Sequence, residues 1–247
     1  MLSIGSVQLG NVPRVVLGVS GDDPALAQAR AAGVDILELR IDQFDDLAPE
    51  SVSREIKAIR KHGLPLIGTI RSRAEGGKSR IPDAKRASLY QRVAQWVDAV
   101  DIELSSGDVL KRARPVIEKH KNVLIISYHH FSGTPADTQL AEIVDHAVAE
   151  GADIIKIATF TESEDDVLRL LNFTSKHRAK HLVSIAMGAK GTISRLVFPL
   201  AGSLMTYTST APADGQVPLS TLIDDLRLYY PRFNEAMIDR LKLLEYA

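Results

Sequence analysis

Short runs of apolar and β-branched residues recur along the chain, and amphipathic stretches lie between them. Several of these runs are apolar on both faces, as are parallel strands that lie under a layer of helices. The pattern therefore predicts eight strands, at residues 12–19, 35–39, 65–70, 99–104, 122–128, 153–158, 181–186 and 203–207.

The stretches between the runs repeat apolar residues at intervals of three and four positions, which is the spacing of an amphipathic helix. They predict helices at residues 24–32, 49–61, 82–97, 108–120, 136–150 and 163–179. The first of these begins with Asp22-Asp23-Pro24, and acidic residues and proline are typical of a helix N-terminus.

Strands that alternate with helices are typical of either an eight-stranded barrel or a doubly wound open sheet. The chain has 247 residues and a single (β/α)8 barrel has about 250, so the length favours the barrel. No Gly/Ser-rich linker or low-complexity segment divides the chain. We therefore expect an α/β protein in which residues 1–247 form one (β/α)8 TIM barrel, a single catalytic domain.

The charge balance and the absence of cysteine narrow the classes of partner and chemistry. The 30 Lys and Arg residues against 31 Asp and Glu residues give no reason to expect nucleic acid or an anionic membrane as a partner. Without cysteine, disulfides, thiolate catalysis and cysteine-based metal centres are excluded. The longest apolar run, residues 123–126, is far shorter than the ~20 residues that cross a bilayer. Since residues 1–10 also lack the features of a secretory signal, we expect a soluble cytoplasmic protein.

Polar residues gather where the predicted strands end. In barrels of this kind, catalytic groups lie at the carboxyl ends of the strands and in the loops that follow. The residues at these places are Ser20, Glu38, Arg40, Arg71, Glu75, Asp101, Glu103, His129, His130, Lys156, Arg195 and Gln216. One mouth of the barrel is therefore expected to be rich in charged groups. No metal-ligand spacing such as His-Glu-x-x-His occurs, so we expect no metal site.

Lys156 stands in the middle of a predicted strand, between two isoleucines. The strand alternation puts it on one face with Ile154 and Ala158, which we expect to be the barrel interior. Burial of a lone charge is costly, so such a lysine is either paired or neutral. A neutral lysine amine attacks ketones and forms an imine. The alternative is a structural lysine that pairs with Glu38 or Glu103.

The histidines and arginines at the strand ends allow two interpretations each. His129 and His130 point to opposite faces of their strand, so at most one of them faces the barrel mouth. An imidazole there would be a proton shuttle, and the alternative is a histidine that only makes a structural hydrogen bond. Arg40, Arg71 and Arg195 could bind a carboxylate through their guanidinium groups, or they could be solvated surface residues.

Taken in order, seven short segments resemble the motifs of type I 3-dehydroquinate dehydratase. They are ELRID (38–42), TIRSRAEGG (69–77), DIEL (101–104), SYHHF (127–131), KIA (156–158), GTISR (191–195) and GQ (215–216). The resemblance runs from about residue 13 to residue 225, and each segment lies at the end of a predicted strand. Any one of them would be a weak signal, but seven in the family's order make a strong match.

The resemblance implies a single (β/α)8 barrel, commonly a homodimer, that needs neither a metal nor an organic cofactor. It implies the syn-dehydration of 3-dehydroquinate to 3-dehydroshikimate through a lysine imine (Schiff base), in the shikimate pathway of aromatic amino acid biosynthesis. Matched by motif, Lys156 forms the imine, His129 is the general acid and base, and Glu75 orients that histidine. The matched substrate contacts are Ser20, Glu38, Arg40, Arg71, Arg195 for the carboxylate, and Gln216 from a closing loop.

The chain departs from the family pattern at two places. His130 stands where the family often has aspartate, and residues 212–216 read PADGQ where a serine is usual. Either that hydroxyl contact is lost or Thr210 supplies it. Two other functions stay open: a different lysine-imine barrel of the class I aldolase type, and a non-catalytic barrel that binds a metabolite.

Overall fold

Eight parallel strands form a nearly closed barrel in the computed structural model, which describes residues 2–210 and 215–245. The strands are β3 (Arg14–Val19), β4 (Ile36–Arg40), β5 (Leu66–Thr69), β6 (Ala99–Glu103), β7 (Val123–His130), β8 (Ile154–Phe160), β9 (Leu182–Met187) and β10 (Met205–Ser209). Their order in the sheet is β10-β3-β4-β5-β6-β7-β8-β9. At the amino ends of β9 and β10, the Leu204 N–H donates to Leu182 O at 2.9 Å. Each strand overlaps one of the eight predicted runs, so the predicted barrel is confirmed.

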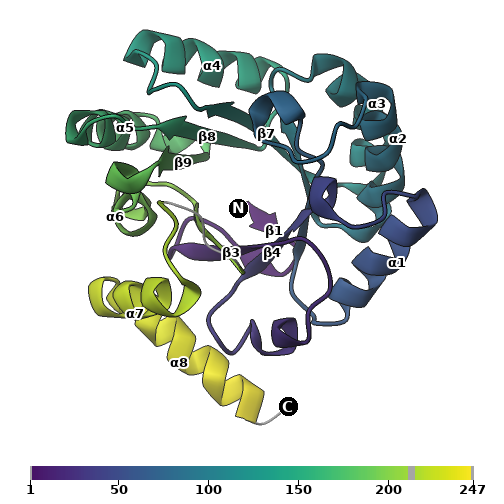
Figure 1. The fold of residues 1–247 in the computed structure, drawn as a ribbon. Coiled ribbons are helices and arrows are strands. Elements are labelled where there is room, and N and C mark those ends of the chain that lie inside the picture. The colour runs from purple at the N-terminus through teal and green to yellow at the C-terminus, as the bar shows by residue number, and fades with distance from the viewer. Residues whose placement is uncertain (1, 211–214, 246–247) are drawn as a thin grey trace.

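A ring of helices surrounds the strands (Figure 1). They are α1 (Pro49–Arg60), α2 (Asp83–Val93), α3 (Gly107–His120), α4 (Asp137–Ala149), α5 (Glu164–Lys176), α6 (Ser194–Ala201), α7 (Leu219–Tyr229) and α8 (Pro231–Glu245). Within residues 2–210 and 215–245, none of the helices has the length and apolarity to cross a membrane.

The first predicted helix, at residues 24–32, is wrong in type and length. The chain there forms a 3-10 helix, Pro24–Gln28, whose N-cap Asp23 accepts a hydrogen bond from Ala25 N. Leu26 is the one residue of this short helix that is buried. Because a single apolar contact gives little reason to extend a regular helix, the segment stays a short connection.

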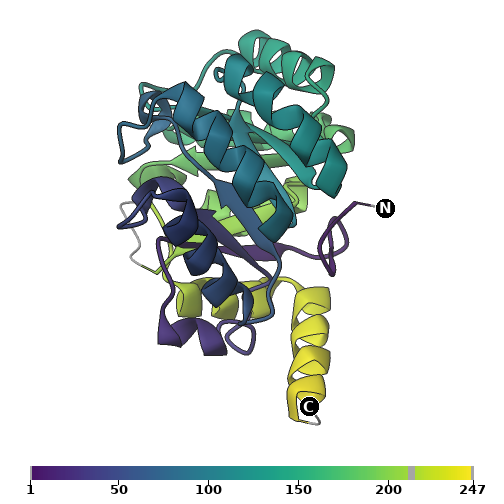
Figure 2. The same cartoon turned by 90° about the vertical axis from the view of Figure 1, so that its right-hand side faces the viewer.

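Two short strands that the pattern did not predict close the amino end of the barrel. β1 (Ser3–Ile4) and β2 (Val7–Gln8) pair in an antiparallel hairpin. The hairpin lies over the barrel centre in Figure 1 and at one end of the barrel in Figure 2. Ile4 is fully buried and packs with apolar residues of the barrel interior. The hairpin thus seals the end of the barrel that is remote from the carboxyl ends of the strands.

The barrel interior changes from apolar to polar along the strands. At the amino end, the inward side chains are Val16, Ile36, Ile67, Ala99, Ile125, Ile154, Val183 and Met205. Because every second residue of a strand faces inward, the next inward position lies two residues further on. At that level five strands carry polar residues: Glu38, Thr69, Asp101, Ser127 and Lys156. The polar and charged layer at the carboxyl end of the barrel therefore rests on a packed apolar layer at the amino end.

Candidate active site

Lys156 lies inside the barrel and is held by two carboxylates. Its Nζ donates to Glu38 Oε1 and to Asp101 Oδ2, each at 3.0 Å, and its side chain is 5% exposed. The ammonium lies 4.3 Å from the ring centroid of Tyr207, a cation–π contact. Of the two partners considered from the sequence, Glu38 pairs with Lys156, and Asp101 takes the place of Glu103.

Arg71 also binds Asp101, one of the two carboxylates that hold Lys156. Its Nη2 donates to Asp101 Oδ2 at 2.9 Å, and its Nη1 donates to Glu103 Oε1 at 3.1 Å and to Ser127 Oγ at 2.7 Å. Burial opposes the charged guanidinium, but Asp101 and Glu103 raise the pKa of Arg71 well above its usual value. Burial likewise opposes the charge of Asp101, while Arg71 and Lys156 hold the pKa of that carboxyl far below its usual range. Both groups therefore stay charged inside the barrel.

Glu103 joins a further cation to this network. It accepts hydrogen bonds from Arg71, from the Ser72 N–H and from the buried Arg86. Arg86 also donates to Ser106 Oγ at 3.0 Å. We call the six groups the barrel charge cluster: Lys156, Arg71 and Arg86 with Glu38, Asp101 and Glu103. Three cations face three carboxylates in it, so its formal charge is balanced.

His129 and Glu75 form the second pair of the site. His129 Nδ1 lies 2.9 Å from Glu75 Oε2, and the same oxygen accepts the His129 backbone N–H at 2.9 Å. Burial, with the positive charges of Arg71 and Lys156, lowers the pKa of His129 well below its usual value. Burial raises the pKa of Glu75 to about 7. A neutral imidazole that donates from Nδ1 to Glu75 leaves Nε2 as an acceptor, which is the tautomer that a general base needs.

The turn that carries Glu75 is built by its neighbours. Ser72 caps the 3-10 helix Arg73–Glu75 by accepting the Ala74 N–H, and Gly76 follows with a left-handed φ of 88°. At Gly77, a Cβ atom would lie 2.1 Å from Arg71 O. The two glycines therefore let the chain fold back closely against the end of β5, and this brings Glu75 to the end of β7.

His130, the neighbouring histidine, points away from this pair. Its Nδ1 lies 2.8 Å from Gly133 O, and its ring stacks on that of Tyr128 with centroids 6.0 Å apart. The alternation of the strand thus separates the two histidines, as the sequence predicts.

A cavity of about 370 Å³ opens at the carboxyl ends of the strands. It is lined by the predicted residues Ser20, Glu38, Arg40 and Gln216, together with Lys78 and Tyr207, among others. Arg40 is held by Asp42 in a bidentate pair, with both distances 3.0 Å. Because Glu38 and Tyr207 both contact Lys156 and line the cavity, a ligand there would lie next to the lysine. The volume suits a small molecule.

Arg195 lies in the first turn of α6 and makes a separate set of contacts. It is 5% exposed, and its Nη1 donates to Ser194 Oγ at 3.2 Å and to Ala186 O at 3.4 Å. In the described part of the chain, its Nε has no hydrogen-bond partner. Burial lowers the pKa of Arg195 to about 10. A bound carboxylate would satisfy this nitrogen and supply a counter-charge.

The loop after β10 reaches the cavity at both of its described ends. Ser209 Oγ donates to Gln216 Oε1 at 2.9 Å, and Thr210 lines the cavity. Residues 211–214, and with them the departure from the family pattern at Pro212, lie outside the described residues. Whether Thr210 replaces the usual serine contact stays a prediction.

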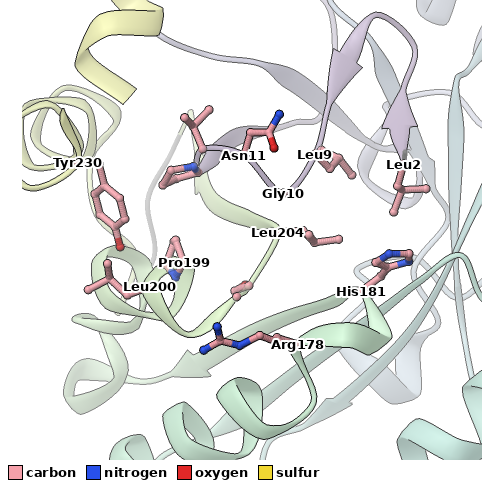
Figure 3. Close-up of a pocket in the computed structure, with 14 residues that line it drawn as sticks. Leu2, Leu9, Gly10, Asn11, Arg178, His181, Pro199, Leu200, Leu204 and Tyr230 are labelled. Atoms are coloured by element: carbon pink, nitrogen blue, oxygen red, sulfur yellow. The ribbon is translucent and has the colours of Figure 1, made fainter. Parts of the chain in front are cut away.

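A larger cavity, of about 560 Å³, lies at the opposite end of the barrel. Figure 3 shows Leu9, Leu200 and Leu204 around it, with Arg178 and His181 at one side. Its described lining contains no predicted site residue. Since the chemistry of barrels of this kind lies at the carboxyl ends of the strands, the smaller cavity is the candidate active site.

Several polar groups of the site were not predicted from the sequence, among them Arg86, Tyr207 and Ser105. Asp101 was predicted among the polar residues at the strand ends, but without a role, and its place as one of two acids in a buried strand could have indicated one. Tyr207 lies on the inward face of β10, but no motif in the sequence around it indicates a chemical role. Ser105, whose hydroxyl donates to Glu75, follows a strand as many loop serines do. Within the described residues, no cluster of three or more His, Cys, Asp or Glu side chains could hold a metal ion.

The fold and the site together define a (β/α)8-barrel enzyme with a buried lysine next to a cavity and, on the neighbouring strand, a histidine bound to a carboxyl group. A family model described as type I 3-dehydroquinase matches residues 15–231. The chain belongs to this family.

Relatives and solved structures agree with this assignment. A 3-dehydroquinate dehydratase of Thermodesulfovibrio yellowstonii is 36% identical over 219 residues, which cover 87% of this chain and 95% of the relative. A type I enzyme of Clostridium difficile, solved with covalent modified comenic acid, has a TM-score of 0.86 at 27% identity and covers 92% of this chain and 96% of its own. The 3-dehydroquinate dehydratase of Aquifex aeolicus has a TM-score of 0.77 at 34% identity, and the match covers 88% of this chain and 99% of the Aquifex chain. The predicted family resemblance is therefore confirmed.

Proposed function

We propose that this protein dehydrates 3-dehydroquinate to 3-dehydroshikimate in the shikimate pathway, through an imine on Lys156. The observation that carries the proposal is the position of Lys156 Nζ: it lies inside the barrel, 3.0 Å from Glu38, a residue that lines the cavity. The family of the chain supports the same reaction. So does the relative from Clostridium difficile, because its modified ligand, comenic acid, is also a small organic acid.

The covalent step begins with a neutral Lys156 amine that attacks the C3 ketone. Both carboxylates lie 3.0 Å from Nζ, and because Arg71 holds Asp101 ionised, Glu38 is proposed to take the proton that the ammonium loses. The hydroxyl of the adduct takes that proton and leaves as water, which gives a cationic imine that draws electrons from C2 and makes its protons acidic.

His129 then acts twice. As a base, it takes a C2 proton on Nε2 and leaves an enamine, while Glu75 holds the protonated ring through Nδ1. As an acid, it returns that proton to the departing C1 hydroxyl, which leaves as water. Hydrolysis of the product imine restores Lys156, so the net reaction is the loss of one water molecule.

The substrate contacts are proposed for the residues that were predicted from the sequence. Ser20, Glu38, Arg40 and Gln216 line the cavity, which supports their contact with the ring hydroxyls. The buried Nε of Arg195 supports its role as the carboxylate-binding residue. For Arg71, contact with substrate stays a prediction, and the bonds it makes here position the carboxylates around Lys156.

We further propose that residues 1–247 act as one catalytic domain in a cytoplasmic homodimer. The family resemblance supports the dimer, and the near-zero net charge supports a small-molecule partner rather than nucleic acid or a membrane. Sedimentation equilibrium tests the dimer, and a single species of 27.0 kDa would contradict it.

Borohydride reduction in the presence of 3-dehydroquinate tests the central proposal. We expect a reduced substrate adduct on Lys156 by mass spectrometry, and the ultraviolet absorbance of the conjugated enone in the unreduced reaction. The Lys156→Met variant should lose both signals, whereas Lys190→Met, which changes a half-exposed surface pair, should keep them. Turnover without an adduct would refute the imine. Absence of both turnover and adduct would favour a metabolite-binding barrel, and carbon–carbon cleavage would favour an aldolase.

A further inference from the structure

The two oxygens of Glu75 have different partners. Oε2 accepts the backbone N–H of His129 and faces its Nδ1, both at 2.9 Å. Oε1 accepts a hydrogen bond from Ser105 Oγ at 2.5 Å. Ser105 stands in the loop between β6 and α3 and is exposed, whereas Glu75 is 6% exposed. The hydroxyl of an exposed residue therefore bonds to the Glu75 oxygen that does not face the histidine.

Several charged and titratable groups act on Glu75 from the surrounding elements. They are Arg71 at the end of β5, Glu103 on β6, and Tyr128 and His129 on β7. Burial and the charge of Glu103 oppose ionisation of Glu75, while Arg71 and the two donors, Ser105 and the His129 N–H, favour it. The ionised carboxylate thus depends on a small set of donors, and Ser105 supplies the only side-chain hydroxyl among those bonds in the described residues.

We propose that Ser105 is a positioning residue for the reaction, and that its hydroxyl fixes one oxygen of Glu75 so that the other remains directed at His129 Nδ1. This inference rests on the proposed function, because it requires His129 to be the acid and base. Ser105 itself contacts neither the cavity nor Lys156 among the described residues, so it acts through Glu75.

Loss of the hydroxyl has two physical consequences. The carboxylate becomes free to turn about its terminal bond, so Oε2 no longer has a fixed direction toward the imidazole. The ionised form also loses a donor, and the pKa of Glu75 moves upward from about 7. A protonated Glu75 no longer stabilises the imidazolium that forms when His129 takes the substrate proton.

The test compares pH profiles of kcat/KM for the parent protein and the Ser105→Ala, Ser105→Thr and Ser88→Ala variants. For Ser105→Ala we expect an acid limb displaced upward by about one pH unit, which is a tenfold change in the proton affinity of Glu75 and lowers kcat/KM about fivefold at pH 7. Above pH 9 the loss should be smaller than at pH 7, because Glu75 is then ionised in both proteins and only the lost direction of Oε2 remains. Ser105→Thr keeps a hydroxyl and should restore the profile. Ser88→Ala, which removes a hydroxyl bonded to Ala84 O in its own helix, should leave it unchanged.

Two results would overturn the inference: an unshifted acid limb in Ser105→Ala, or a loss of the same size at every pH. Borohydride trapping of 3-dehydroquinate in the same variant separates this failure from that of the proposed function. An adduct on Lys156 with an unshifted profile refutes the role of Ser105 and leaves the imine intact. Absence of an adduct in the parent protein refutes the proposed function itself, and the inference with it.

Discussion

Replacement of Lys156 by methionine removes one charge from the barrel charge cluster and little else. Methionine keeps an unbranched stem, and its sulfur can pack against the ring of Tyr207, which now lies 4.3 Å from the ammonium. The substitution deletes the donor to Glu38 and Asp101, so two cations then face three carboxylates.

The cost follows from the partners that remain. Asp101 keeps Arg71 at 2.9 Å, but Glu38 keeps only the Thr69 hydroxyl, at 2.9 Å, among its side-chain partners in the described residues. The uncompensated charge therefore falls mainly on Glu38. Breaking a buried pair on one side costs about 3–5 kcal/mol, and we expect Lys156→Met to lose that much of its free energy of unfolding at pH 7.

A second substitution tests whether charge is the cause. In the double variant Lys156→Met/Glu38→Gln, two cations face two carboxylates, and the new amide can still bond to Thr69. We expect the double variant to recover about 2 kcal/mol relative to the sum of the two single variants, which is a coupling of the size seen for groups in contact.

Urea unfolding followed by circular dichroism measures these differences, with m-values compared to confirm that the unfolding transition is unchanged. Lys190→Met serves as the matched control, because the Lys190–Glu164 pair is solvent-exposed at 3.6 Å and is worth at most about 1 kcal/mol. A loss below 1 kcal/mol for Lys156→Met would refute the charge balance. So would a double variant whose loss equals the sum of the single losses.

Four further outcomes test the site. His129→Ala should still trap the imine with borohydride but lose about 10²–10⁴ in kcat, and full turnover would assign the acid and base to another residue. Arg195→Ala should raise KM at least about tenfold, and an unchanged KM would contradict carboxylate binding. Gly77→Ala should lower stability by about 1–3 kcal/mol in thermal unfolding, because its Cβ would lie 2.1 Å from Arg71 O; an unchanged Tm would show that the turn adjusts freely. The acid limb of kcat/KM should have its midpoint near pH 7, since activity needs ionised Glu75, and Glu75→Gln should abolish that limb.

The strands of the barrel could be predicted because each is a short buried run with clear ends. The hairpin β1–β2 could not, since strands of two residues carry no measurable alternation. The last three helices were missed for different reasons. Pro199 and the exposed Leu200 obscure the apolar face of α6. In α7 and α8 the apolar residues Leu222, Leu226, Phe233 and Met237, which pack with Val15, do recur at helical spacing, but no helix was predicted there.

The predicted site residues follow from one rule, that polar groups at the carboxyl ends of barrel strands share a mouth. The rule does not say which carboxylate meets which cation. Asp101 and Glu103 face the same way along β6, and only their depth in the barrel differs. Glu103 lies one repeat higher, where Arg71 and Arg86 reach it, whereas Asp101 lies deeper and is bound by Lys156 and Arg71. Depth depends on the stagger of the strands, which the alternation of residue types does not encode.

The charge balance also bears on the proposed reaction. A protonated imine at the position of Nζ carries the same single positive charge as the ammonium, so the barrel charge cluster stays balanced when the ketone becomes an imine. At the enamine stage the positive charge has moved with the C2 proton to His129, so two cations of the cluster face three buried carboxylates, a state that the charges of Glu38 and Asp101 disfavour. Expulsion of the C1 hydroxyl restores the positive nitrogen and with it the balance. The fixed carboxylates therefore favour the elimination step over accumulation of the enamine.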